Sequence, residues 1–155
     1  MDELPALLSR GEVDFIVMDY HLERANLECE YLGQEELVII ESKKDVGRND
    51  IILDHNFTDQ VTESFFRKQK RKKPVYRRSY FSDCYGIING VELGLGRAII
   101  SSHLVKKNKL VKISKEFKSL SLDVFLYYHS QPFYSKIQRS VVEELKKHVA
   151  ANLSK

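Results

Sequence analysis

Catalytic chemistry finds little support in the types and spacing of the polar residues. The histidines are scattered along the chain, at His21, His55, His103, His129 and His148. None of them forms a helical metal-binding pair, no serine has the flanking glycines of a hydrolase nucleophile, and no glycine-rich loop ends in a phosphate-binding lysine. The sequence therefore predicts a protein that is not an enzyme and that uses no cofactor or metal.

The best place to bind a small ligand is the predicted helix start at Ser82-Asp83, because apolar residues recur at helical spacing after it, at Ile87, Ile88 and Val91. The unpaired N–H groups and the positive dipole end of a helix start attract an anion, and the Ser82 hydroxyl adds a donor. Asp83 would repel a carboxylate ligand. We expect Ser82 and Asp83 to line the ligand site; the alternative is that Ser82 only caps its own helix.

Three further pairs of residues lie at or just beyond the ends of predicted strands. They are Asp19-Tyr20, Ser101-Ser102 and Tyr127-Tyr128. Ligands of open α/β domains bind beyond the carboxyl ends of the strands. Alternate residues of a strand point to opposite faces, and of the two tyrosines we place Tyr128 at the ligand. For each pair, capping or packing is the competing interpretation.

The strongest charge feature is the basic tract of residues 67–73, Arg-Lys-Gln-Lys-Arg-Lys-Lys, which Arg77 and Arg78 follow beyond Pro74. Its cations suit the carboxyl end of a helix, so the tract is interpreted first as a solvated helix end. The alternative is a patch that binds an anion or a partner, including nucleic-acid phosphates. No aromatic residue interrupts the tract itself.

Apolar periodicity predicts the elements that must position these residues. Predicted helices cover residues 3–10, 59–73, 82–93, 101–106 and 135–149, and predicted strands cover 15–18, 37–40, 51–53, 75–80, 98–100, 110–113 and 122–128. Gly11 ends the first helix, and residues 19–26 form a loop. Strands that alternate with helices indicate open α/β layers.

Composition sets the broad class. The 155 residues are 43% hydrophobic and 30% charged, as in an ordinary globular protein, and the formal net charge of +3 is too small to indicate nucleic-acid binding by itself. The N-terminus Met-Asp-Glu-Leu-Pro carries acid where a secretory signal carries base, and no apolar run is long enough to span a membrane. Cys29 and Cys84 are too few for a disulfide framework and predict free thiols. We expect a cytoplasmic protein.

Four segments, taken together and in order, resemble a known family. They are Leu-Ser-Arg-Gly-Glu-Val-Asp-Phe-Ile at 8–16, Leu-Gly-Gln-Glu-Glu-Leu-Val-Ile-Ile at 32–40, Val-Glu-Leu-Gly-Leu-Gly-Arg-Ala-Ile-Ile at 91–100, and the strand at 122–128 with the helix from Ser135. This set, which covers nearly all of the chain, resembles the effector-binding domain of LysR-type transcriptional regulators. Ser101 stands where that family usually has proline, and Arg97 occupies a usually apolar place. The family's winged helix, its linker helix and the strand–helix–strand that normally precedes Leu4 have no counterpart here.

The resemblance implies an α/β fold with two lobes, of the periplasmic-binding-protein type II, with open, mostly parallel sheets flanked by helices and an incomplete first lobe. We expect residues 1–42 and 125–155 to form part of lobe I, and residues 43–124 to form lobe II. The implied function is to bind a small metabolite, with anions among the candidates, in the cleft between the lobes and so to modulate transcription.

The implied partners are this effector and further copies of the chain in a homo-oligomer. DNA would be contacted only through a winged-helix domain outside this chain, and no membrane is involved. Two alternatives stay open: a degenerate module of the same fold that binds partners or itself, and a stand-alone solute-binding protein.

Overall fold

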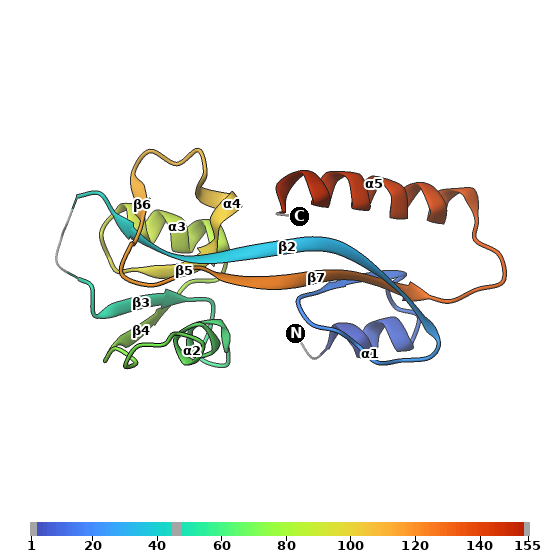
Figure 1. The fold of residues 1–155 in the computed structure, drawn as a ribbon, viewed down its shortest axis with the longest axis horizontal. Helices are drawn as coiled ribbons and strands as arrows, with labels where there is room; N and C mark the ends of the chain where they lie inside the picture. The colour runs from blue at the N-terminus through green and yellow to red at the C-terminus, as the bar shows by residue number, and fades with distance from the viewer. Residues whose placement is uncertain (1–2, 45–47, 154–155) are drawn as a thin grey trace. The chain divides into compact units, whose positions relative to one another are not determined.

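The computed structural model describes residues 3–44 and 48–153, which fold into two compact units (Figure 1). Unit 1 is Met1–Glu35 with Ser121–Lys155, and unit 2 is Glu36–Leu120. The chain passes between them twice, within β2 (Leu27–Ser42) and at the start of β7 (Leu120–His129). The lobe boundaries expected after residues 42 and 124, and the incompleteness of the first lobe, stay predictions.

In unit 1, β7 lies between β1 (Phe15–Met18) and β2, and it pairs antiparallel with β1. Side chains alternate between the two faces of these strands, so each face builds its own core. On one face Ile16, Met18 and Tyr127 pack with Leu8 of α1 (Leu4–Ser9).

The other face of unit 1 is covered by α5 (Lys136–Asn152). Buried residues of β2 and β7, Leu32 and Leu126, pack there with Val142 and Leu145 of the helix. The helix begins as its sequence predicts. The Ser135 hydroxyl accepts a hydrogen bond from the Gln138 N–H, and the Gln138 side chain accepts one from the Ser135 N–H, forming a capping box.

In unit 2, the second half of β2 pairs antiparallel with both β5 (Ala98–Ser101) and β6 (Val111–Ile113). The strand β3 (Ile51–Asp54) pairs in parallel with β4 (Arg77–Tyr80). The helices of this unit are α2 (Val61–Arg67), α3 (Cys84–Glu92) and α4 (Ser102–Val105). Its core consists of Val38, Ile40, Leu53, Ile87, Ile88, Val91, Ala98, Ile100, Val105 and Val111.

Two glycines shape the turn between α3 and β5. Gly94 has a φ of 76°, a conformation that favours glycine. A Cβ atom on Gly96 would lie 2.7 Å from the backbone oxygen of Ile51, so this position needs glycine for close approach of the two segments. The predicted helix end at these glycines is confirmed.

The α/β class and the order of helices and strands are confirmed, with three corrections. The sheets are not mostly parallel: of the strand pairs whose register is described, only β3–β4 is parallel. The two long strands that carry the chain between the units, β2 and β7, have antiparallel neighbours: β1 pairs with β7, and β5 and β6 pair with β2. The strand expected at 37–40 is longer and starts at Leu27, and its first half is less buried than its second half. Finally, α2 ends at Arg67, so most of the basic tract lies outside the helix.

Candidate functional site

The residues predicted to bind a ligand come from both units. Unit 2 holds Ser82, Asp83, Ser101 and Ser102, and unit 1 holds Asp19, Tyr20 and Tyr128.

The start of α3 is capped by Asp83 and not by Ser82. Asp83 has extended backbone geometry, and its Oδ1 accepts a hydrogen bond of 2.9 Å from the backbone N–H of Gly86. An N-cap side chain reaches the N–H three residues onward, which places the cap at Asp83 once the helix begins at Cys84. The interpretation of Ser82 as the cap is therefore wrong. Ser82 is exposed, and the helix start already carries a carboxylate.

Ser101 and Ser102 are both buried at the junction of β5 and α4. Ser101 pairs with Leu37 across the sheet and occupies the N-cap position of α4, but its side chain makes no capping hydrogen bond to that helix. The competing interpretation of Ser101 as a side-chain cap is therefore wrong, and its role as a ligand contact stays a prediction.

In unit 1, Asp19 and Tyr20 follow β1 directly, as predicted; Asp19 is half-buried and Tyr20 is exposed. Tyr128 is half-buried near the end of β7, where it pairs with Phe15 of β1. Of the seven predicted residues, Tyr128 is the one that lines the well-formed pocket of this unit.

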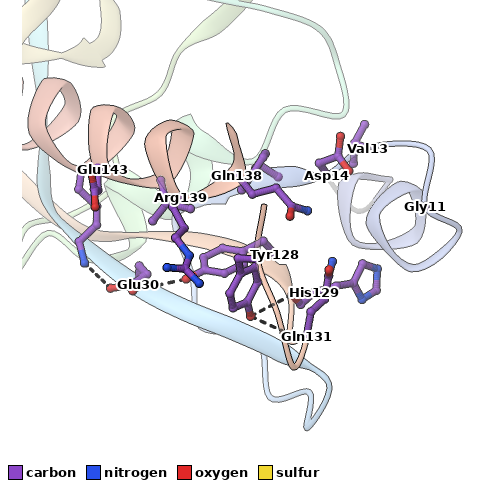
Figure 2. A pocket seen from close by; sticks show the side chains of 14 residues that line it. Gly11, Val13, Asp14, Glu30, Tyr128, His129, Gln131, Gln138, Arg139 and Glu143 are labelled. Carbon is purple, nitrogen blue, oxygen red and sulfur yellow. Dashed lines mark hydrogen bonds and ion pairs between the residues drawn. The ribbon is translucent and has the colours of Figure 1, made fainter. Parts of the chain in front are cut away.

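This pocket has a volume of about 440 Å³ and lies within unit 1 (Figure 2). Its walls come from the loop between α1 and β1, the first half of β2, the end of β7 with the turn that follows, and the start of α5. The Tyr128 ring centroid lies 5.8 Å from that of Phe15 and 5.6 Å from that of Tyr134. Together with Val13 and Val142, these rings give the pocket an apolar wall.

Polar contacts fix the floor of the pocket. Lys146 Nζ lies 2.7 Å from Glu30 Oε2, and the Tyr128 hydroxyl donates to Glu30 Oε1 over 3.5 Å. Burial, with the nearby negative charge of Glu30, raises the pKa of Tyr128 to about 12. Tyr128 is therefore neutral, and a hydrogen-bond donor, at physiological pH.

Two charged residues of α5 complete the lining. Arg139 and Glu143 are exposed, and neither side chain has an ion-pair partner within residues 3–44 and 48–153. Figure 2 shows Arg139 extending along the side of Tyr128 toward Glu30. Aromatic rings beside unpaired charges of both signs can hold a small planar or zwitterionic molecule. The arrangement holds no nucleophile paired with a base.

Sequence reasoning missed Glu30, Tyr134, Arg139 and Glu143. Glu30 lies in the half of β2 that was not predicted as a strand, and α5 was interpreted through its apolar face alone. One signal was present: Gln138, Val142 and Lys146 recur at intervals of four, the spacing of one helix face, and all three line the pocket.

No three histidine, cysteine or acidic residues of the described ranges form a group that could hold a metal ion. Within the same ranges, no helix is long and apolar enough to cross a membrane. Both cysteines are free, as predicted; Cys29 is exposed and Cys84 is half-buried.

Solved structures with the same fold are regulators. LysG from Corynebacterium glutamicum, with bound effector Arg, has a TM-score of 0.80 and 15% identity, over 99% of this chain and 57% of that one. ArgP from Mycobacterium tuberculosis has a TM-score of 0.82 and 15% identity over the same shares. The CcmR regulatory domain from Synechocystis, in complex with 2-PG, has a TM-score of 0.72 and 14% identity, over 95% of this chain and 78% of that domain.

The chain thus spans little more than half of the length of the LysG and ArgP chains. A search of curated proteins finds no match. The family model for the LysR substrate binding domain matches residues 1–150. The chain therefore belongs to the LysR substrate-binding domain family, whose fold is of the periplasmic-binding-protein type II.

Proposed function

We propose that this chain is the effector-sensing domain of a cytoplasmic transcriptional regulator, and that it binds a small-molecule effector rather than catalysing a reaction. The family match over residues 1–150 carries this proposal. Similar structures give it further support, since LysG is described with bound Arg and the CcmR domain in complex with 2-PG.

For the effector site we keep the seven predicted residues, drawn from both units. A ligand that contacts two units stabilises one relative arrangement of them, and this is how binding becomes a signal. Asp83 places a negative charge at the start of α3, which disfavours a purely anionic effector. We therefore favour a zwitterion such as an amino acid, whose ammonium group would pair with Asp83 or Asp19.

The free edge of β1 supports a homo-oligomer. Among the described strands, β1 pairs only with β7, so its other edge keeps unpaired N–H and C=O groups, and Val17 is 43% exposed. Exposed sheet edges favour pairing with another chain. A Val17→Lys variant places a charge on this edge strand and should shift the mass measured by light scattering toward the monomer. An unchanged mass would contradict assembly through β1.

Thermal unfolding of the intact chain tests effector binding. We would screen the standard amino acids, small carboxylates and phosphorylated acids. A true effector at 100 times its Kd adds about 2.7 kcal/mol to the free energy of unfolding. No stabilisation by any compound, with the oligomer retained, would favour the alternative of a module that binds only partners.

Two variants locate the site of any ligand found. If the predicted site is right, Ser82→Ala combined with Ser102→Ala weakens binding measured by calorimetry, whereas Ser121→Ala, an exposed serine, leaves it unchanged. Weakening by Arg139→Ala alone would instead place the ligand in the pocket of unit 1. That result would overturn the residue assignment but not the sensing function.

A further inference from the structure

The basic tract of residues 67–73 is joined in unit 2 to a second basic segment that is distant in sequence. The Gln69 side chain donates a hydrogen bond of 3.0 Å to the backbone oxygen of Lys118 and accepts one of 3.2 Å from its N–H. Arg71 Nη1 donates to the backbone oxygen of Glu116 over 2.5 Å. These contacts hold residues 115–118 beside the tract.

An aromatic anchor fixes the junction. The Phe117 ring lies 5.3 Å from the Phe66 ring, edge to face, and the Arg71 guanidinium lies over Phe117 at 5.7 Å from its centroid. Phe66 itself is buried in unit 2. The two segments therefore form one surface held by specific contacts, and they are not two independent loops.

The charge of this surface is mostly uncompensated. Lys73 pairs with Glu63, and Glu116 pairs with Arg97. Five other lysines are exposed and have no side-chain partner in the described part of the chain. They are Lys68, Lys70, Lys72, Lys115 and Lys118. Since most of the tract lies beyond α2, its charges are not explained by the carboxyl end of that helix.

We infer that this surface, formed by residues 67–73 and 115–118, binds the phosphate backbone of duplex DNA without reading its sequence. Lysines are point charges that suit phosphate contacts, and each contact releases a counterion. Single-stranded nucleic acid is disfavoured because base stacking needs open aromatic faces. Here Phe66 is buried and the face of Phe117 is occupied by Arg71.

This inference is independent of effector binding, because all of its residues belong to surface segments that contain none of the seven proposed ligand residues. In a regulator, such a surface would hold the sensing domain on the DNA next to the site that the DNA-binding domain occupies. Its contribution would be the same for every DNA sequence.

Fluorescence anisotropy with a labelled duplex of random sequence tests the inference on the full chain. We expect weak, salt-dependent binding, with a Kd on the order of 10⁻⁴ to 10⁻⁶ M. The logarithm of the affinity should fall with the logarithm of salt concentration with a slope of up to about −4.5 for five lysines, at about −0.9 per phosphate contact.

Two triple variants that remove the same charge distinguish the contribution of this surface from that of the net charge of the chain. Lys68→Gln, Lys70→Gln and Lys72→Gln together remove three phosphate contacts. They should weaken binding and make the slope smaller in magnitude by about 2.7. Lys106→Gln, Lys107→Gln and Lys109→Gln remove the same charge from exposed positions elsewhere in unit 2 and should leave binding unchanged. Equal losses in both variants, tighter binding of a single strand, or no binding by the wild type would each overturn the inference. Thermal unfolding checks that both variants fold.

Discussion

Arg78 Nε lies 2.5 Å from Asp54 Oδ2, and this ion pair is almost fully removed from water: the Asp54 side chain is 5% exposed and that of Arg78 is 17% exposed. The Thr62 hydroxyl donates to the other oxygen of Asp54 over 2.6 Å. The same guanidinium donates to the backbone oxygens of Asn56, Phe57 and Asp59. Arg78 thus holds the end of β3, the loop that follows it and β4 in one arrangement.

The first prediction follows from this pair. Arg78→Met should leave Asp54 buried without its partner and lower the free energy of unfolding by about 3 kcal/mol, since breaking one side of a buried pair is costly. The adjacent Arg77→Met is the control, because Arg77 is exposed and its pair with Asp50 contributes less than about 1 kcal/mol. Equal losses in the two variants, measured by urea unfolding, would contradict this account.

A second prediction concerns Gly86, in the first turn of α3, and Gly96, in the turn between α3 and β5. Gly96→Ala should destabilise the chain by about 1–3 kcal/mol, because the added Cβ would lie 2.7 Å from the backbone oxygen of Ile51. Gly86→Ala should be neutral or stabilising, since its Cβ would meet nothing closer than 3.4 Å and alanine favours the helix. Thermal unfolding of both variants checks the difference in sign.

The capping box of α5 gives a third prediction. Ser135→Ala removes the acceptor for the Gln138 N–H and should cost about 1 kcal/mol of stability. Ser140→Ala, an exposed position inside the same helix, should cost nothing, because alanine has the higher helix propensity. If the two substitutions had the same effect in denaturant unfolding, Ser135 would not be acting as a cap.

A fourth prediction is the alkaline titration of Tyr128. Its pKa is raised from 10.0 to about 12, first by burial and then by the charge of Glu30. A raised pKa means that the folded state favours the protonated form of Tyr128. The contribution of this residue to the free energy of unfolding is therefore complete below pH 10 and is lost as the pH rises toward about 12. Tyr128→Phe should remove one late transition from the tyrosinate absorbance curve.

Much of the fold was predictable because local signals were strong. Gly11, with a φ of 70°, ends α1, and Ser135 with Gln138 starts α5, as the sequence patterns indicate. The first half of β2 also carried a local signal, which the sequence prediction overlooked. Residues 27–31, Leu-Glu-Cys-Glu-Tyr, alternate between apolar and polar side chains, as in a half-buried strand, and β7 is the neighbouring strand in the sheet.

The candidate site was less predictable than the fold. Ser82 and Asp83 are both good caps, and only the start of the helix at Cys84 decides between them. The pocket of unit 1 brings Glu30 next to Lys146, which lies 116 residues away, and no local pattern indicates such a pairing. Asp19 follows β1 directly and Tyr128 lies within β7, as the sequence predicted. Their role as ligand contacts stays a prediction.

The claim that a small molecule acts through both units is tested most directly by a distance between them. Spin labels would be attached to Cys29 in unit 1 and to Asn89→Cys in unit 2, with Cys84→Ala to remove the other thiol. Pulsed electron paramagnetic resonance then measures the distance between the two labels. We predict that a compound that raises the thermal stability also shifts or narrows the distance distribution. A distribution that stays unchanged while the compound saturates the protein would contradict the claim that the effector acts through both units.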